Sequence, residues 1–399
     1  MLNYALEFTG LLIRWLHLIA GIAWIGSSFY FIWLDRSLEP PEPGSDEAKK
    51  GVGGHLWAVH GGGFYNPQKY LVAPAKLPEK LHWFMWEAYT TWLSGTALLA
   101  LVYWHRAGSM MLDPAISALA PWQAVALGAG SMLGSWLVYD WLCRSPLGKR
   151  DALLGVIVFA LLTALGWGLA HALAGRAVFI QVGACIGTIM AGNVFFVIIP
   201  GQRRMVAALR AGRDPDPLDG KCGKQRSVHN NYFTLPVLFT MISNHYASTY
   251  GHAHSWAVLA LIAAAGVVIR HFFNLRHKGI YAWHYPALGA VILGGVCWWT
   301  APRLAPLPPV TGDVNFNRVR GIVGQRCVAC HSPAPTYPGL AAAPAGVLLH
   351  TPADILRNAQ RIHLQTVVTR MMPLGNVTQM TDEERAVIAA WIGAGAKSD

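Results

Sequence analysis

Long apolar stretches, separated by short polar segments, occupy the first three quarters of the chain. About 20 apolar residues are enough to cross the hydrocarbon core of a bilayer as a helix, so these stretches predict transmembrane helices. The sixth is the weakest, because Asn244 and His245 lie near its end. The eight predicted spans are residues 10–33, 83–104, 121–142, 152–171, 177–199, 232–249, 255–275 and 283–301.

The pattern changes after the eighth span, where a Pro-rich segment leads into a more polar region with short helical periodicities. We therefore expect an all-α protein with a membrane domain at 1–301, a linker at 302–312 and a small α-helical domain at 313–399. In this last domain a helix is expected at about 314–328. A final helix is predicted to begin at a capping box, with Thr381 as the cap and Glu384 three residues later.

Composition supports the membrane interpretation. Hydrophobic residues make up 54% of the 399 residues and charged residues 13%, well below the roughly 25% typical of soluble domains. These values exclude an intrinsically disordered chain, a collagen-like repeat and a solitary soluble domain.

The net charge of +11 raises the question of nucleic-acid binding, and the position of the charges answers it. Odd-numbered loops between the predicted spans carry 18 Lys and Arg residues, whereas even-numbered loops carry 2. Cytoplasmic loops collect Lys and Arg, so we expect the odd loops inside and both termini outside, with the lipid bilayer and not nucleic acid as partner.

The strongest chemical motif is Cys327-Val328-Ala329-Cys330-His331, the C-x-x-C-H pattern of covalent haem c attachment. Two thiols at this spacing can each form a thioether to one haem edge, and the adjacent His331 supplies an axial iron ligand. A zinc site would need a second Cys/His pair, and the domain offers only two further histidines.

The second axial ligand is expected from a later loop, because His–Met ligation is typical of electron-transfer haems. Met371 and Met372 precede Pro373, which favours a loop at this position. Met372 is the preferred candidate, followed by Met371 and then Met380.

Ionisable and amide side chains within the spans are costly in a membrane and therefore mark candidate sites. Arg14 and His17 share a face of the first span, and His245 is expected near the same outer level. We take these three as candidate catalytic residues. Amide and Arg side chains suited to a flat heterocyclic anion are Asn193, Asn230, Asn231, Asn274 and Arg270, of which all but Asn274 are our candidate substrate-binding residues. The polar residues expected near the inner side also include His60, His82, His229, His271 and His284.

Five segments of the membrane part carry a family resemblance, namely residues 14–26, 60–70, 86–95, 193–202 and 226–236. They resemble the bacterial membrane-bound, cytochrome c-linked urate oxidases (urate hydroxylases). The resemblance implies a multi-pass protein of the bacterial inner membrane that converts urate to 5-hydroxyisourate. It implies that electrons leave through a periplasmic haem c to a soluble cytochrome c or a terminal oxidase rather than directly to oxygen. No catalytic residue is carried over.

The expected geometry leaves an electron-transfer problem. A substrate site near the inner surface would lie too far from an outer haem c for one direct step across a hydrocarbon core of about 30 Å. Either urate binds in the outer half, or a second cofactor such as a haem b bridges the membrane, with His17 and His245 as candidate ligands. Two alternatives stay open: a quinol-oxidising or electron-relay cytochrome, and a transporter or sensor that carries a cytochrome module.

Overall fold

The fold is largely helical with a few short strands. The computed structural model of the protein describes residues 2–74, 77–301, 306–337, 340 and 342–398. Residues 302–305 of the predicted linker lie outside this described part.

The long helices belong to the first 300 residues. The helices there are α1 (Leu2–Ser37), α2 (Asp46–Lys49), α3 (Trp86–Leu98), α4 (Ala107–Met110), α5 (Pro121–Arg144), α6 (Asp151–Ala170), α7 (Gly175–Gly192), α8 (Ile199–Arg210), α9 (Pro217–Ile242), α10 (Ala247–Tyr250), α11 (Ser255–Arg276) and α12 (His284–Thr300). The shorter 3₁₀ or π-helical segments are η1 (Leu99–Trp104), η2 (Pro146–Lys149), η3 (Asn193–Ile198) and η4 (Ser243–His245).

Four strands follow α1 and form two small antiparallel sheets, in which β1 pairs with β4 and β2 pairs with β3. Their bounds are β1 (Val52–His55), β2 (Ala58–His60), β3 (Gly63–Tyr65) and β4 (Gln68–Tyr70). An ion pair between Lys69 on β4 and Asp35 near the end of α1 ties the strands to the helix.

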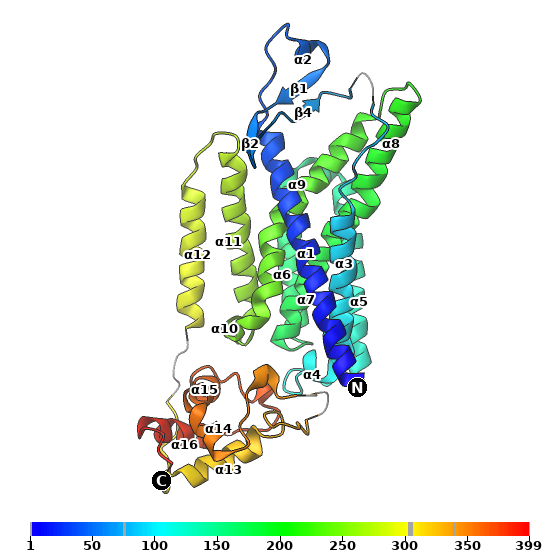
Figure 1. Ribbon diagram of the computed structural model, residues 1–399. Coiled ribbons are helices and arrows are strands. Elements are labelled where there is room, and N and C mark those ends of the chain that lie inside the picture. The colour runs from blue at the N-terminus through cyan, green and yellow to red at the C-terminus, as the bar shows by residue number, and fades with distance from the viewer. Residues whose placement is uncertain (1, 75–76, 302–305, 338–339, 341, 399) are drawn as a thin grey trace.

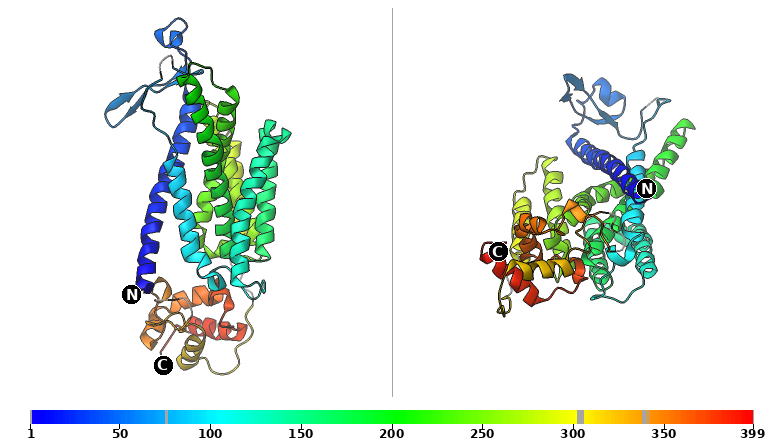
Figure 2. Two further views of the ribbon diagram at one scale, coloured as in Figure 1. Left: turned by 90° about the vertical axis from the view of Figure 1, so that its right-hand side faces the viewer. Right: turned by 60° about the horizontal axis from the view of Figure 1, so that its bottom comes forward.

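The long helices run side by side, and the two ends of this bundle differ (Figures 1 and 2). The strands and the tip where α8 leads into α9 lie at one end. The N-terminus and the C-terminal helices lie at the other end. We call these the strand end and the C-domain end of the bundle.

Four helical stretches in the described part are long and apolar enough to cross a membrane: Phe8–Ser37, Asp151–Ala170, Gly175–Arg210 and Ser255–Arg276. Large apolar side chains point outward from the helices, among them Trp15 at 63% exposure. A water-soluble surface rarely exposes apolar side chains in such contiguous bands.

The sixth predicted span is displaced relative to its helix. Helix α9 begins at Pro217 and ends at Ile242, whereas the prediction placed the span at 232–249. The start is set by Asp216, whose side chain accepts a hydrogen bond from the Leu218 N–H, and by proline at the first helical position. The apolar pattern does not cover this first half because residues 217–225 are largely polar and are partly or fully exposed.

The chain between α7 and α8 stays helical but widens into the π-helical segment η3. Pro200 follows it and has no N–H to donate, and its ring crowds the carbonyl of the preceding turn. A π-helical segment accommodates that disruption without ending the helix, and such segments are frequent at functional sites.

The C-terminal part contains the helices α13 (Phe316–Arg326), α14 (Pro352–Arg357), α15 (Ala359–His363) and α16 (Asp382–Gly393), with short segments η5 (Pro344–Gly346), η6 (Leu364–Val368) and η7 (Leu374–Asn376). The predicted capping box is confirmed, since Thr381 accepts from the Glu384 N–H and the Glu384 carboxylate accepts from the Thr381 N–H. Ile388 and Trp391 on α16 are buried in a core shared with Phe316 on α13.

Candidate functional site

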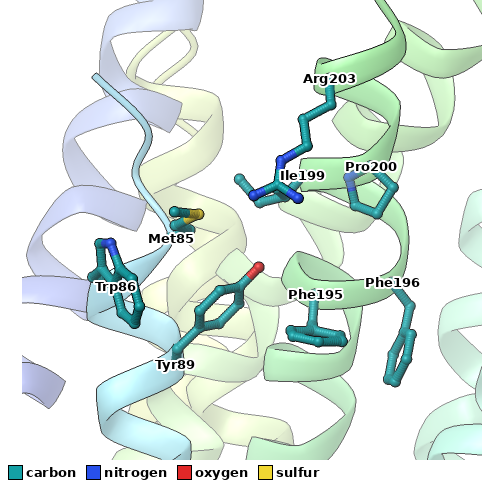
Figure 3. Close-up of a pocket in the computed structure, with 8 residues that line it drawn as sticks. All are labelled: Met85, Trp86, Tyr89, Phe195, Phe196, Ile199, Pro200 and Arg203. Atoms are coloured by element: carbon teal, nitrogen blue, oxygen red, sulfur yellow. The ribbon is translucent and has the colours of Figure 1, made fainter. Parts of the chain in front are cut away.

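A cavity of about 400 Å³ lies between the start of α3 and the junction of η3 with α8. Figure 3 shows Tyr89 and Arg203 reaching into it from opposite sides, with the Tyr89 hydroxyl turned toward the guanidinium. Phe195 and Phe196 form the far wall, and both rings are more than half exposed. The cavity therefore combines one cation with aromatic walls.

A buried polar network lies deeper, where α5, η3 and α9 meet. Arg226 is 3% exposed and pairs with Asp140 at 2.7 Å while donating to the Asn193 side-chain oxygen at 3.0 Å. Its guanidinium also lies over the Tyr139 ring, 5.0 Å from the centroid. The Tyr139 hydroxyl is 2.7 Å from Nδ1 of His229. The Arg226 side chain is almost fully enclosed and that of Asp140 is 18% exposed, so removing either partner would leave a poorly solvated charge.

Asn193 and Asn230, both predicted as substrate-binding residues, are brought together in this network. The Asn193 amide donates to the Asn230 side-chain oxygen at 2.8 Å and to the Tyr139 hydroxyl at 3.2 Å. The Asn230 amide donates to the Met190 carbonyl at 3.0 Å. Their amides are therefore already used in holding α5, α7 and α9 together.

The other two predicted substrate-binding residues form a second group on α9 and α11. Arg270 donates through Nε to the Asn231 side-chain oxygen at 2.9 Å and lies 4.0 Å above the Phe29 ring. One turn later on α11, Asn274 is completely buried, and Arg36 of α1 donates to its backbone carbonyl at 2.6 Å. The Nη2 of Arg270 and both polar side-chain atoms of Asn274 have no hydrogen-bond partner.

The predicted catalytic trio of Arg14, His17 and His245 is not joined by any contact in the described residues. Arg14 and His245 are exposed, on α1 and on the segment after α9. Nδ1 of His17 lies 3.0 Å from the Thr91 carbonyl and 3.1 Å from the Ser94 hydroxyl on α3. A Cβ at Gly95 would approach the His17 ring to 2.9 Å, so glycine there lets α1 and α3 pack closely.

The Cys-x-x-Cys-His residues lie at the end of α13. Both Cys327 and Cys330 are free thiols, the first buried and the second half-buried. Burial raises the pKa of the Cys327 thiol to about 12. Nδ1 of His331 lies 2.9 Å from the Val347 carbonyl, which holds the ring and leaves Nε2 as its second nitrogen.

The segment that carries Met372 is held by a buried arginine. Arg385 of α16 is 4% exposed and donates to the Met372 carbonyl at 3.1 Å and to the Thr366 carbonyl. Met371 and Met372 are partly exposed, whereas Met380 is 3% exposed within the apolar core. Met380 therefore has a packing role, and the tandem pair has the more accessible sulfurs.

Some residues of these networks were not expected from the sequence. Arg226 and Arg36 enter the sequence pattern only as charges of the loops, and no motif singles out Asp140 or Tyr139. A buried pair such as Arg226 with Asp140 joins positions 86 residues apart, so no local spacing reveals it. The aromatic cavity of Figure 3 was missed for the same reason, since α3 and η3 are distant in sequence.

Within the described part, no group of three or more His, Cys, Asp or Glu side chains is arranged to hold a metal ion. Comparison with curated proteins and comparison with solved structures each returned no match. A family model described as urate oxidase N-terminal matches residues 3–301, about three quarters of the chain. This match covers every long helix and both buried polar networks, and the chain belongs to the urate oxidase N-terminal family.

Proposed function

We propose that this protein oxidises urate to 5-hydroxyisourate and passes the electrons through a haem c, bound by residues 313–399, to a respiratory acceptor. The proposal rests on the presence of two features in one chain. A urate oxidase N-terminal match covers residues 3–301, and a Cys-x-x-Cys-His motif follows it at 327–331. A urate oxidase joined to an electron-transfer module has a route for electrons other than direct reduction of oxygen.

The reaction balances without oxygen as reactant. Urate and one water give 5-hydroxyisourate, two protons and two electrons. A haem c supplies one-electron transfer when bound, so the electrons leave singly. Two equivalents of a one-electron acceptor, such as a soluble cytochrome c or a terminal oxidase, would complete each turnover.

The residues of the C-terminal part fit a covalent haem. Cys327 and Cys330 are free thiols at the thioether spacing. His331 uses Nδ1 on a backbone carbonyl, the arrangement that orients metal-binding histidines and keeps Nε2 for the metal. Met372 lies on a segment anchored by Arg385, which favours it as the second axial ligand.

We further propose a multi-pass protein of the bacterial inner membrane, built as an eight-helix bundle with both termini and the cytochrome domain in the periplasm. Four apolar helices support the membrane location. The N-terminus and the C-terminal helices lie at one end of the bundle, and the Lys/Arg-rich loops lie at the other, which agrees with the charge rule (Figure 1).

For the residues that act on urate we propose a role for His17. Among the predicted catalytic residues, His17 has one ring nitrogen engaged by α3, which leaves Nε2 for a proton or a metal. A haem b with His17 as a ligand would shorten the path of electrons to the C-terminal domain. The pyridine haemochrome spectrum tests this second haem, since a c-type spectrum alone would exclude it.

The deciding experiment is anaerobic mixing of the purified, oxidised protein with urate while the haem spectrum is recorded. Reduction of haem c by urate supports the proposal. An oxidised spectrum that ascorbate readily reduces would refute it.

A pair of variants isolates the role of the motif. The double variant Cys327→Ser/Cys330→Ser should lose haem that survives denaturing electrophoresis, whereas Cys222→Ser, an exposed cysteine elsewhere, should retain it. Equal haem staining in both variants would contradict covalent attachment at the motif.

The cavity of Figure 3 favours a second candidate function, a quinol-oxidising or relay cytochrome. Its aromatic walls, the Tyr89 hydroxyl and the exposed rings of Phe195 and Phe196 would suit a quinol ring entering from lipid. A soluble quinol that reduces the haem when urate does not would favour this function over urate oxidation.

A further inference from the structure

Three unpartnered polar atoms lie within one turn of α11. Arg270 is 5% exposed and Asn274 is completely buried. The Arg270 Nη2, the Asn274 amide nitrogen and the Asn274 amide oxygen have no hydrogen-bond partner. Buried polar groups in native proteins are nearly always paired, so such a concentration indicates a missing partner.

The charge around these atoms is positive. Arg36 donates to the Asn274 backbone carbonyl and lies close enough to Arg270 for the two charges to repel. Among the described residues, no carboxylate pairs with either arginine. The neighbouring Asp35 is engaged by Lys69 and by Lys224 instead. A buried arginine without a counter-ion is strongly unfavourable, so the missing partner is expected to be an anion.

The chemistry of these side chains would suit a flat partner with both donors and acceptors. Asn231 fixes the Arg270 guanidinium through Nε, and the Phe29 ring supports the guanidinium plane at 4.0 Å. The fixed Nη2 offers N–H donors, while the Asn274 amide offers both a donor and an acceptor. A planar heterocyclic anion with adjacent carbonyl and N–H groups along one edge would satisfy all three atoms.

We propose that α1, α9 and α11 form a binding site for a planar, oxo-substituted heterocyclic anion, contacted by Arg270 and Asn274 and preorganised by Asn231, Phe29 and Arg36. If the proposed function holds, that anion is urate. The Asn193 and Asn230 amides are excluded from this site because their partners are protein atoms.

This location has a consequence for electron transfer. Phe29 and Asn274 lie on the parts of α1 and α11 toward the strand end, whereas the C-terminal helices lie at the opposite end (Figure 1). Phe29 is also twelve residues beyond His17 on α1, about 18 Å along the helix. An anion oxidised here would need a redox relay through the bundle to reach a haem c.

Two substitutions test the site in opposite ways. Arg270→Gln removes the fixed cation. Asn274→Asp keeps the shape and supplies a carboxylate beside Arg270, so the protein provides its own anion. Arg276→Gln is the matched control, because it removes a charge from an exposed position on the same helix.

Binding is measured by equilibrium dialysis of radiolabelled urate against the full-length protein in detergent, with the haem reduced beforehand to prevent turnover. We expect Arg270→Gln and Asn274→Asp each to weaken urate binding by about 10- to 100-fold, the range for losing one charge-assisted hydrogen bond. Arg276→Gln should bind as the unaltered protein does. Caffeine, a flat purine with no charge and no N–H group, should bind at least tenfold more weakly than urate.

Thermal unfolding without ligand shows whether Asn274→Asp supplies the missing charge to the site or damages the fold. Asn274→Asp should raise Tm because Arg270 gains a counter-ion, whereas a misfolded variant would lower it. Wild-type urate affinity in both site variants, or a lower Tm for Asn274→Asp, would overturn the site.

Failure of the site and failure of the proposed function are distinguishable. If urate reduces the haem of the unaltered protein and the site variants bind urate normally, the site is wrong and the function stands. If urate binds in an Arg270-dependent way and never reduces the haem, the function is wrong and the site stands.

Discussion

The buried Arg226–Asp140 pair makes a sharp stability prediction, because the same carboxylate also binds an exposed arginine. Arg226 pairs with one Asp140 oxygen at 2.7 Å with its side chain 4% exposed, and Arg144 pairs with the other at 2.7 Å with its side chain 66% exposed. The two ion pairs have equal length and differ mainly in contact with water. Removing each arginine in turn therefore tests how burial affects the contribution of an ion pair to the free energy of unfolding.

The structure gives a magnitude for each substitution. Arg226→Met removes a charged hydrogen bond from Asp140 and leaves the buried Asn193 oxygen without its donor. Breaking a buried pair of this kind costs about 3–5 kcal/mol. Arg144→Ala removes an exposed pair and should cost about 0–1 kcal/mol.

The assay is thermal unfolding in detergent, followed by intrinsic tryptophan fluorescence. At about 2 °C per kcal/mol for a large domain, Arg226→Met should lower Tm by roughly 6–10 °C. Arg144→Ala should lower Tm by about 2 °C or less. Similar shifts for the two variants would refute the reasoning that burial controls this pair.

Three further predictions follow from local contacts. Thr381→Ala removes the cap of α16 and should cost about 1 kcal/mol, seen as a lower Tm for loss of the C-terminal helices by circular dichroism. Gly183→Ala would put a Cβ against the Thr240 hydroxyl and should lower the Tm of the bundle, whereas Gly187→Ala meets nothing within 4 Å and should not. The pKa of Asp354 lies below its ordinary value of 3.8, because the side chain of Thr351, the cap of α14, hydrogen-bonds the Asp354 carboxylate. The ionised carboxylate therefore stabilises the fold fully above pH 3.8, and this stabilisation is lost as pH falls through the lowered pKa.

Each has an outcome that would contradict it. An unchanged Tm for Thr381→Ala would mean that packing alone sets the start of α16. Equal effects at Gly183 and Gly187 would mean that close approach to α9 is not limiting. The acid limb of the unfolding curve should flatten in Asp354→Asn, and an unaltered limb would assign the acid sensitivity to other carboxylates.

Much of the helical architecture could be predicted from the sequence, because helices that span a bilayer have a recognisable local sequence pattern. Length, apolar content and the distribution of Lys and Arg are local quantities, and they predicted the helices α6, α7 and α11 directly. The capping box at Thr381 was predictable for the same reason, since its two hydrogen bonds join residues three positions apart. The start of α9 was not, because its first turns are polar and exposed and therefore lie outside any apolar stretch.

The candidate sites likewise divide into those that local sequence reveals and those that depend on packing. Spacing alone singled out Cys327, Cys330 and His331, because the haem c motif is contiguous in the chain. The sequence also selected Arg270 and Asn231 as unusual residues for a membrane helix. It could not tell them from Asn193 and Asn230, since all four have polar side chains in apolar surroundings.

Only the tertiary structure decided which of these polar groups are already satisfied. Asn193 meets Arg226 and Tyr139 across three helices, so its hydrogen bonds are complete, whereas Asn274 is enclosed with its amide unpaired. Hydrogen-bond satisfaction depends on atoms brought together from distant parts of the chain. The sequence determined which residues have the chemistry, and the packing of α1, α9 and α11 determined where that chemistry is left without a partner.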